Sequence, residues 1–317
     1  MLRCGISSVF GACMLIVMTT AVAAPAVDDA VPKIALWTPS IDDTAGRISE
    51  RSDDPALPDR IIEDVREPYL AVYAPRRPNG TALLVTPGGG YARIVLDKEG
   101  TALVPAFVDA AGITLFVLRY RLPDRRHAEG TDAPLADAQR AMRLIRARAS
   151  DYGIDPEQVG VMGFSAGGHV AARLATTPDA VYVDRDAADT QSFRPDFALL
   201  VYPVISMHAP LAHAGSRTRV LAAGDMPEDI ALDRYSPDLH VDDRTPPLFL
   251  LHAQDDDVVP VGNALLMHAA ALRAGVPASL HVFPQGGHGF GTRGATGALA
   301  RWPQLALDWI QEQTPSP

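Results

Sequence analysis

Short, continuous apolar stretches recur along the chain, separated by longer segments of mixed character. Stretches of this length predict strands that are buried on both faces, because a half-exposed strand would alternate apolar and polar residues. A sheet built from them needs helices on both sides. The predicted strands occupy residues 69–73, 81–86, 113–118, 197–203, 247–252 and 279–283, and another leads into Gly163.

A helical period is clearest over residues 134–152, where apolar side chains repeat on one face. That face contains Leu135, Ala138, Met142, Leu144 and Ile145. Four arginines lie largely outside it and are expected to be solvated: Arg140, Arg143, Arg146 and Arg148. Residues 263–274, which stop at Gly275, and residues 302–313 predict two further helices. Helices that alternate with buried strands indicate an α/β fold with a mostly parallel central sheet.

Two segments depart from this alternation. Residues 28–64 are rich in proline and charge, and we expect an extended entry with one short strand at residues 34–37. Residues 206–245 combine glycine, proline, histidine and charged residues with short helical stretches, which indicates an insertion over a pocket. Spacing alone assigns no role to any residue inside this insertion.

The first residues of the chain form a unit of their own. Residues 1–23 carry one charge, Arg3, followed by an apolar run and by the small residues Ala21 and Ala23. This pattern predicts a secretory signal peptide cleaved after Ala23. An uncleaved membrane anchor is the alternative, because the apolar run is nearly long enough to span a bilayer. Cleavage implies a periplasmic or secreted protein without stable membrane association.

Composition favours one catalytic domain after this leader. A chain of 317 residues with 47% hydrophobic content can bury one large core, which we place at residues 66–317 behind an N-terminal extension at residues 24–65. Cys4 and Cys13 both fall in the leader, so the mature chain would have neither a disulfide nor a thiol nucleophile. The formal net charge of −10 opposes binding to nucleic acid and fits a neutral or weakly charged substrate.

The candidate chemistry begins at residues 161–169, Val-Met-Gly-Phe-Ser-Ala-Gly-Gly-His. A strand-like approach, a Gly-x-Ser-x-Gly turn and a helix-like exit indicate a nucleophile elbow, in which a serine occupies a strained turn. Gly163 and Gly167 are the small residues that such a turn needs where backbones crowd together. Ser165 is therefore the candidate nucleophile.

A glycine turn follows the strand at residues 81–86, where Pro87 is followed by three glycines. Free backbone N–H groups in such a turn can approach the oxyanion that forms when a carbonyl is attacked, together with the N–H after the serine. A flexible loop is the alternative if the turn is considered by itself. The expected oxyanion-hole donors are Gly89, Gly90 and Ala166.

A candidate acid and base follow later in the chain. Three aspartates at residues 255–257 come after the strand that ends at His252, where an orienting carboxylate belongs. In isolation, they would equally suit a solvated loop or a weak cation site. His288 lies between glycines on a loop after the last predicted strand. The order serine, aspartate, histidine is that of α/β-hydrolase triads.

Together these motifs resemble the α/β-hydrolase fold of the esterase and lipase superfamily, nearest to bacterial carbohydrate esterases of the acetylxylan esterase kind. The resemblance covers nearly all of the mature chain. It rests on Pro-Gly-Gly-Gly-Tyr at 87–91, Gly-Phe-Ser-Ala-Gly-Gly-His at 163–169, His-Ala-Gln-Asp-Asp-Asp-Val-Val-Pro at 252–260 and Gly-Gly-His-Gly-Phe at 286–290. In similar enzymes one residue separates the triad acid from Val-Val-Pro, which implies Asp256, with Asp255 as the fallback.

The resemblance also bears on the substrate pocket. Pro87 stands where the His-Gly-Gly-Gly esterases carry histidine, so their loop geometry does not transfer directly, although the glycine donors remain. In similar enzymes an insertion at the place of residues 206–245 shapes the acyl and alcohol sites. Substrate binding is therefore expected there and around Tyr91.

The remaining histidines are expected to be structural. His169 lies on the helix after Ser165 and should pack or hydrogen-bond within the fold. His252 and His281 lie in predicted strands and should be satisfied core histidines. His208 and His213 have no metal-ligand spacing, so neither a metal nor another cofactor is expected.

The resemblance implies acyl transfer through an acyl-enzyme, carried out by Ser165, His288 and Asp256. It favours a serine carboxylesterase that removes acetyl groups from a small-molecule or oligosaccharide ester, such as fragments of xylan. The alternatives are a prolyl oligopeptidase-like peptidase, a general lipase or esterase, and a non-catalytic hydrolase-fold binding module. No propeller-length segment is present to gate peptides, and no triad member is missing. The oligomeric state is not predicted.

Overall fold

The core of the fold is a sheet of eight strands in the order β1-β4-β7-β5-β8-β9-β10-β11. The structure, a computed structural model, describes residues 1–2, 31–37 and 46–314. Neighbours from β7 to β11 run parallel, whereas β4 is antiparallel to β7 and β1 to β4. The predicted mostly parallel sheet is thus confirmed. The strands are β1 (Lys33–Ala35), β4 (Tyr69–Tyr73), β5 (Ala82–Thr86), β7 (Thr114–Arg119), β8 (Val159–Phe164), β9 (Ala198–Val201), β10 (Leu248–Ala253) and β11 (Ala278–Phe283).

Helices follow most of the parallel strands, as the alternating pattern predicts. The α-helices are α1 (Ala133–Ala147), α2 (Ser165–Thr176), α3 (Ala214–Ala222), α4 (Glu228–Arg234), α5 (Gly262–Ala274) and α6 (Trp302–Gln313). A π-helix, η2 (Val104–Ala110), lies between β5 and β7. Short 3₁₀ helices are η1 (Thr101–Leu103), η3 (Gly130–Asp132), η4 (Ala149–Tyr152), η5 (Ala187–Thr190), η6 (Pro237–Leu239) and η7 (Leu299–Arg301).

The central strands contribute to two hydrophobic cores, because successive side chains point to opposite faces of a sheet. Leu84 of β5 belongs to the core beneath α1, α2 and α5, whereas Leu83 and Val85 belong to the core beneath η2 and α6. These side chains are fully buried, and burial of each stabilises the fold by about 1.5–3 kcal/mol. The near-continuous apolar strands thus reflect a sheet covered on both sides.

Helix α1 buries three of the four arginines that the sequence pattern places on a solvated face. Each of these three side chains is less than a tenth exposed, because residues of the 178–196 segment cover that face. The ion pairs join Arg140 to Asp186 and Asp189, Arg143 to Asp184 and Asp189, and Arg146 to Asp196. Of the four arginines, Arg148 alone is exposed. The prediction of a solvated arginine face is therefore wrong.

Part of the N-terminal segment is built into the fold. Strand β1 pairs with β4, close to the short strand expected from the sequence, and Ile34 is buried in the core. Strands β2 (Arg47–Glu50), β3 (Arg60–Glu63) and β6 (Ile94–Val95) form a separate antiparallel sheet that the sequence pattern does not predict. An extended entry therefore describes this segment only in part. The predicted signal peptide lies, from residue 3 on, outside the described residues.

Helices α3, α4 and η6 lie in the segment between β9 and β10, where an insertion is predicted at residues 206–245. Val220 of α3 and Ala231 of α4 are buried, so these helices are packed onto the rest of the fold. Across the part of the chain that the structure describes, none of the helices has the length and apolar character that crossing a membrane requires.

Candidate active site

Four loops meet beyond the carboxyl ends of the parallel strands. The loop after β5 carries the glycines, β8 runs directly into Ser165, and the loops after β10 and β11 carry Asp256 and His288. In the sheet, β9 alone separates the pair β5 and β8 from the pair β10 and β11. This edge is where ligand sites of open α/β sheets lie. The topology thus brings together residues that are far apart in the sequence.

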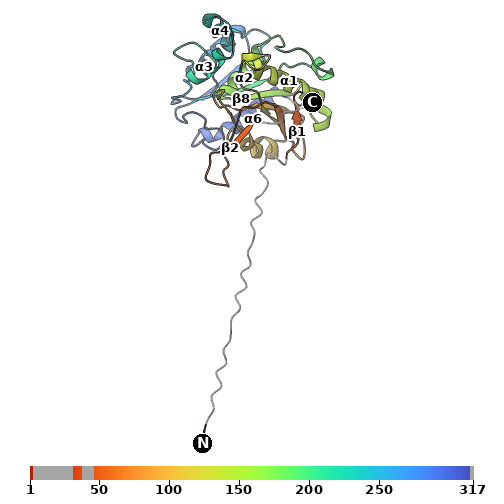
Figure 1. Ribbon diagram of the computed structural model, residues 1–317, viewed down its shortest axis with the longest axis vertical. Helices are drawn as coiled ribbons and strands as arrows, with labels where there is room; N and C mark the ends of the chain where they lie inside the picture. Colours follow the sequence, from red (N-terminus) through yellow and green to blue (C-terminus); the bar gives the residue numbers. More distant parts are fainter. Residues whose placement is uncertain (3–30, 38–45, 315–317) are drawn as a thin grey trace. The chain divides into compact units, whose positions relative to one another are not determined.

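Ser165 lies in a strained turn between β8 and α2, which adjoin in Figure 1. Its φ of 52° is in the left-handed region, which costs a non-glycine residue about 1–3 kcal/mol. A Cβ on Gly167 would lie 2.0 Å from the carbonyl oxygen of Thr86, and one on Gly163 would lie 2.4 Å from that of Gly167. Neither position admits a side chain, which is the crowding that a nucleophile elbow requires.

Ser165, His288 and Asp256 form one hydrogen-bonded chain. Oγ of Ser165 lies 2.9 Å from Nε2 of His288, and Nδ1 of His288 lies 2.7 Å from Oδ2 of Asp256. An ionised carboxylate only accepts, so the imidazole proton resides on Nδ1 and leaves Nε2 free to accept the serine proton. The arrangement can therefore activate a hydroxyl for attack on a carbonyl carbon.

The carboxylate of Asp256 is surrounded by donors. Oδ1 accepts the N–H groups of Val258 and Val259, at 3.0 and 2.8 Å. Oδ2 accepts His288 and lies 3.2 Å from Nε2 of His252. Burial by itself raises the pKa of this carboxyl, but the hydrogen bonds from His252 and His288 outweigh it and hold the pKa well below its ordinary range. Asp256 is therefore ionised wherever the protein is folded near neutral pH.

His252 belongs to this cluster, although the sequence pattern suggests only a satisfied core histidine. Its side chain is fully buried, as expected, and Nε2 also contacts the carbonyl oxygen of Val259 at 2.9 Å. Its Nδ1 has no hydrogen-bond partner among the residues that the structure describes. The one sign of this contact in the sequence is that His252 and Asp256 are four residues apart. That spacing does not predict a contact unless the turn between the two residues is known.

Asp255 and Asp256 offer a matched pair of variants. Asp255 accepts the N–H of Gly287 at 2.8 Å and so fixes the loop that carries His288. We expect Asp256→Asn to lower kcat by about 10²- to 10⁴-fold, because an amide neither stabilises the imidazolium nor selects the correct tautomer. Asp255→Asn keeps an oxygen acceptor for Gly287 and should stay within about fivefold of the parent. Steady-state hydrolysis of p-nitrophenyl acetate measures both, and a larger loss in Asp255→Asn would contradict this ranking.

The glycine loop after β5 presents N–H groups beside the serine. The N–H of Gly88 is already engaged, because it donates to the buried carboxylate of Glu99 at 2.6 Å. Gly89 and Gly90 have φ values of 134° and 63°, line the same cavity as the serine and donate no backbone hydrogen bond to another described residue. The N–H of Ala166 lies in the first turn of α2, where donors lack partners within the helix. All three expected donors are thus available to an oxyanion.

Glu99 braces this loop, a role of which the sequence pattern gives no sign. Its second oxygen accepts the hydroxyl of Tyr202 at 3.0 Å, and the Tyr202 ring packs edge-on to His288 with centroids 5.2 Å apart. Burial raises the pKa of the Glu99 carboxyl, against the hydrogen bonds from Gly88 and Tyr202. Glu99 therefore connects the glycine loop to the wall that holds the histidine.

Tyr91 does not line the cavity, so the prediction that it contacts substrate is wrong. Its side chain is 4% exposed and belongs to the core beneath α1 and α2. Nε2 of His169 donates to the carbonyl oxygen of Tyr235 at 2.7 Å, which leaves Nδ1 to accept the Tyr91 hydroxyl at 2.6 Å. The structural role predicted for His169 is confirmed.

This buried pair makes stability depend on pH. Burial, assisted by the charge of Arg173, lowers the pKa of His169 to about 3, so the unfolded chain binds a proton that the folded chain excludes. The free energy of unfolding should therefore fall as pH drops below about 6.5, by about 2 kcal/mol at about pH 5. His169→Gln keeps an acceptor and a donor but does not titrate. Urea unfolding above pH 6.5 and at about pH 5 measures this dependence. The free energy of unfolding should change less with pH in His169→Gln than in the parent, and an equal change would contradict the assignment.

A cavity of about 390 Å³ contains the reactive side chains. Ser165 and His288 line it together with Gly89 and Gly90. The segment between β9 and β10 supplies His213, Gly215 and Arg219, so the predicted insertion borders the pocket. Burial lowers the pKa of His213, whose Nδ1 lies 2.8 Å from Oγ of Ser216.

The other histidines take no part in this site. His281 is half-buried on the edge strand β11, not in the core as expected, and its ring lies 4.7 Å from that of Phe249. His208 pairs with Asp233 at 2.9 Å. Within the described residues, no group of three or more histidine, cysteine, aspartate or glutamate side chains is placed to hold a metal ion.

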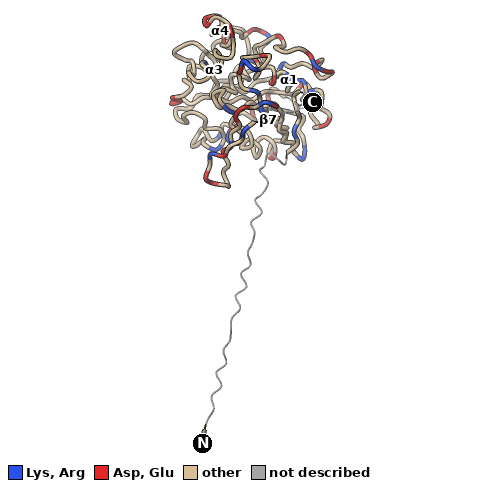
Figure 2. Tube along the Cα trace, in the orientation of Figure 1, with Lys and Arg blue, Asp and Glu red and all other residues tan. Residues whose placement is uncertain are grey.

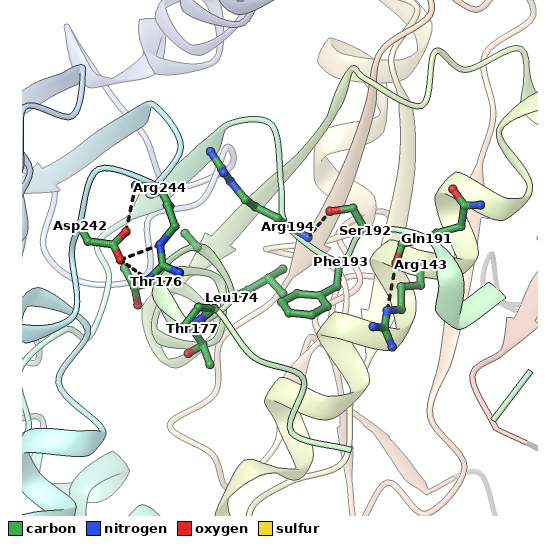
Figure 3. Close-up of a pocket in the computed structure, with 12 residues that line it drawn as sticks. Arg143, Leu174, Thr176, Thr177, Gln191, Ser192, Phe193, Arg194, Asp242 and Arg244 are labelled. Atoms are coloured by element: carbon green, nitrogen blue, oxygen red, sulfur yellow. Dashed lines mark hydrogen bonds and ion pairs between the residues drawn. The ribbon is translucent and has the colours of Figure 1, made fainter. Parts of the chain in front are cut away.

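A second cavity, of about 240 Å³, lies elsewhere in the fold and shares no residue with the first (Figure 3). Its walls include Arg143 of α1, Phe193 and Arg194, and the hydrogen-bonded pair Asp242 and Arg244. None of the residues of the serine site contributes to it. It is therefore a suitable place for a control variant outside the serine site.

Comparison with known proteins gives consistent matches. The BD-FAE family model matches residues 70–271. The acetylxylan esterase of Xylanibacter ruminicola is 33% identical over 232 residues, which are 73% of this chain and 45% of that protein, so the chain spans less than half of this relative. The structure of an acetyl ester-xyloside bifunctional hydrolase from Caldicellulosiruptor lactoaceticus is 35% identical with a TM-score of 0.68, over 89% of this chain and 96% of that one. The structure of MGS-M1, an α/β hydrolase enzyme from a deep-sea metagenome library, is 25% identical with a TM-score of 0.57, over 85% of this chain and 99% of that one.

Proposed function

This chain belongs to the BD-FAE family and has the α/β-hydrolase fold, and from that premise we propose that it is a serine esterase that removes acetyl groups from carbohydrate esters. The observation that carries the proposal is the 2.9 Å contact between Ser165 and His288 at an open cavity. The carbohydrate part is supported by the matched acetylxylan esterase and acetyl ester-xyloside hydrolase.

In the proposed acylation, the Ser165 oxygen attacks the ester carbonyl carbon while Nε2 of His288 takes the hydroxyl proton. The carbonyl double bond becomes a single bond, and its oxygen acquires a negative charge. The N–H groups of Gly89, Gly90 and Ala166 stabilise that charge. As the intermediate collapses, the alcohol leaves with the proton from the imidazolium, and an acetyl group remains on the serine.

In the deacylation, water takes the place of the alcohol. His288 removes a proton from the water, whose oxygen attacks the acetyl carbonyl, and the same backbone donors stabilise the second oxyanion. Collapse releases acetic acid, which ionises to acetate in solution, and the imidazolium of His288 returns its proton to the Ser165 oxygen. Asp256 stabilises the imidazolium in both stages through its 2.7 Å hydrogen bond. The cycle needs no group beyond this chain and water.

A substrate panel tests the proposal. It comprises p-nitrophenyl acetate, butyrate and octanoate, acetylated xylooligosaccharides, and a proline-containing dipeptide anilide. The expected result is preference for the acetate and release of acetate from the oligosaccharides. A preference for octanoate would indicate a general lipase or esterase, and turnover of the anilide a peptidase. Absence of turnover on every substrate would indicate a non-catalytic binding module and overturn the proposal.

We also propose that the protein acts in the periplasm or outside the cell. The support is the apolar leader at residues 1–23, with its Ala-x-Ala pattern at residues 21–23. N-terminal sequencing of protein recovered from the periplasm and the medium tests this. A mature chain that begins at Ala24 is the expected result, whereas recovery with Met1 intact from the cytoplasm alone would overturn it.

A further inference from the structure

The cavity that contains Ser165 has a rim of positive charge. Its one acidic lining residue, Glu99, is buried and engaged by Gly88 and Tyr202. The cationic lining residues are Arg51, Arg93, Lys98 and Arg219. The described residues around this cavity therefore present positive charge and no free carboxylate, although the whole chain has a net charge of −10.

The four cations come from three segments. Arg51 follows β2, Arg93 and Lys98 lie on either side of β6, and Arg219 is on α3. Acidic and basic residues are interspersed over the rest of the fold (Figure 2). A single basic sequence motif therefore does not account for this rim; the tertiary structure assembles it around one cavity.

Three of these cations have no acidic partner. Arg51 pairs with Asp59 at 2.8 Å, whereas Arg93, Lys98 and Arg219 form no ion pair with any described residue. Arg93 and Arg219 are exposed to solvent. Their charge is therefore available to a ligand in the cavity.

We infer that the alcohol part of the substrate carries a carboxylate, as in an acetylated oligosaccharide that contains a uronic acid. This inference rests on the proposed esterase function and deepens it. The acetyl group must lie against Ser165 and His288, so the sugar residues extend along the cavity walls, where the cations lie. A guanidinium can bind a carboxylate through two parallel hydrogen bonds, which suits Arg93 or Arg219.

The net charge of the chain by itself predicts a neutral substrate, and the local charge of the cavity is of the opposite sign. The local charge determines which substrate charge the cavity favours, because screening at physiological ionic strength limits the reach of an exposed charge to about 8 Å. Acidic residues beyond that distance contribute little at the cavity. The substrate class that fits this site is therefore anionic.

The test compares two acetylated xylooligosaccharides that differ only in a glucuronic acid branch. At low salt, the parent enzyme should show a kcat/KM for the acidic substrate about 5- to 20-fold above that for the neutral one. The ratio should fall toward one in about 0.5 M NaCl, because salt screens exposed charges. Equal kcat/KM values at low salt, or a ratio that salt does not change, would overturn the inference.

Variants test whether Arg93 and Arg219 cause the preference for the acidic substrate. Arg93→Gln combined with Arg219→Gln should bring the ratio close to one, and Arg93→Glu combined with Arg219→Glu should reverse the preference. Arg194→Gln, at the second cavity, is the matched control and should keep the parent ratio. A double variant that folds, as judged by circular dichroism, and retains the parent ratio would contradict the assignment. Failure of the esterase proposal would be distinct, because the parent would then not hydrolyse p-nitrophenyl acetate at all.

Discussion

Replacement of Ser165 with alanine is expected to lower kcat/KM for p-nitrophenyl acetate by about 10⁵-fold. Without the hydroxyl no acyl-enzyme forms, and only the oxyanion donors and binding contacts remain to assist water. The circular dichroism spectrum and the melting temperature should stay close to those of the parent, since alanine fits wherever serine does. Steady-state kinetics on freshly purified protein, with unfolding monitored in parallel, measure both quantities.

Ser206→Ala provides the matched control for removing a buried serine hydroxyl. Ser206 is 4% exposed and Ser165 is 5% exposed, but Ser206 does not line the cavity, and its hydroxyl accepts the N–H of His208 at 3.1 Å. Activity within a few-fold of the parent is expected for it. Substantial turnover by Ser165→Ala, at the level of the control, would refute the proposed nucleophile.

Replacement of His288 with alanine is expected to lower kcat/KM by about 10⁴- to 10⁶-fold. The variant retains the serine but loses the group that accepts its proton at 2.9 Å, so the hydroxyl remains a weak nucleophile. The His288 side chain is partly open to the cavity, so added imidazole should enter the vacated space and restore part of the rate. Kinetics across a range of imidazole concentrations measure this rescue.

His281→Ala is the control for this second variant. His281 lies on the strand that precedes the loop of His288 and stacks on Phe249, but it does not line the cavity. Its loss should alter stability slightly and activity within a few-fold. If His288→Ala were as active as His281→Ala, a different residue would have to act as the base.

The sequence predicts those parts of the fold that depend on residues close together in the chain. The elbow at Ser165 could be predicted because its requirements, small residues at 163 and 167, fall within five positions. The loops of Asp256 and His288 could be predicted because both follow apolar strands, and parallel strands place their following loops at one edge of the sheet. Helix α6 agrees with its prediction at both ends, since its amphipathic period is undisturbed.

The parts that could not be predicted depend on contacts between distant segments. Arg140, Arg143 and Arg146 are buried because residues 178–196, which show no periodic pattern, cover that face of α1 with aspartates. Tyr91 follows directly on the oxyanion loop, yet its positive φ turns its side chain toward His169 in the core. The cationic rim likewise has no counterpart in the linear sequence. The pattern of apolar and polar residues predicts which side chains face the core. It does not predict which polar side chains are buried by a segment that follows later in the chain.

Strand β11 pairs with one neighbour, β10, because it is the last strand of the sheet. All six of its residues are at least partly exposed, and the loop that follows it carries His288. The proton acceptor therefore depends on an edge strand, and edge elements open locally at a lower free energy than central strands. Brief fraying at this border would remove the base from the serine while the remaining sheet stays intact, so catalytic competence would be lost before the fold itself.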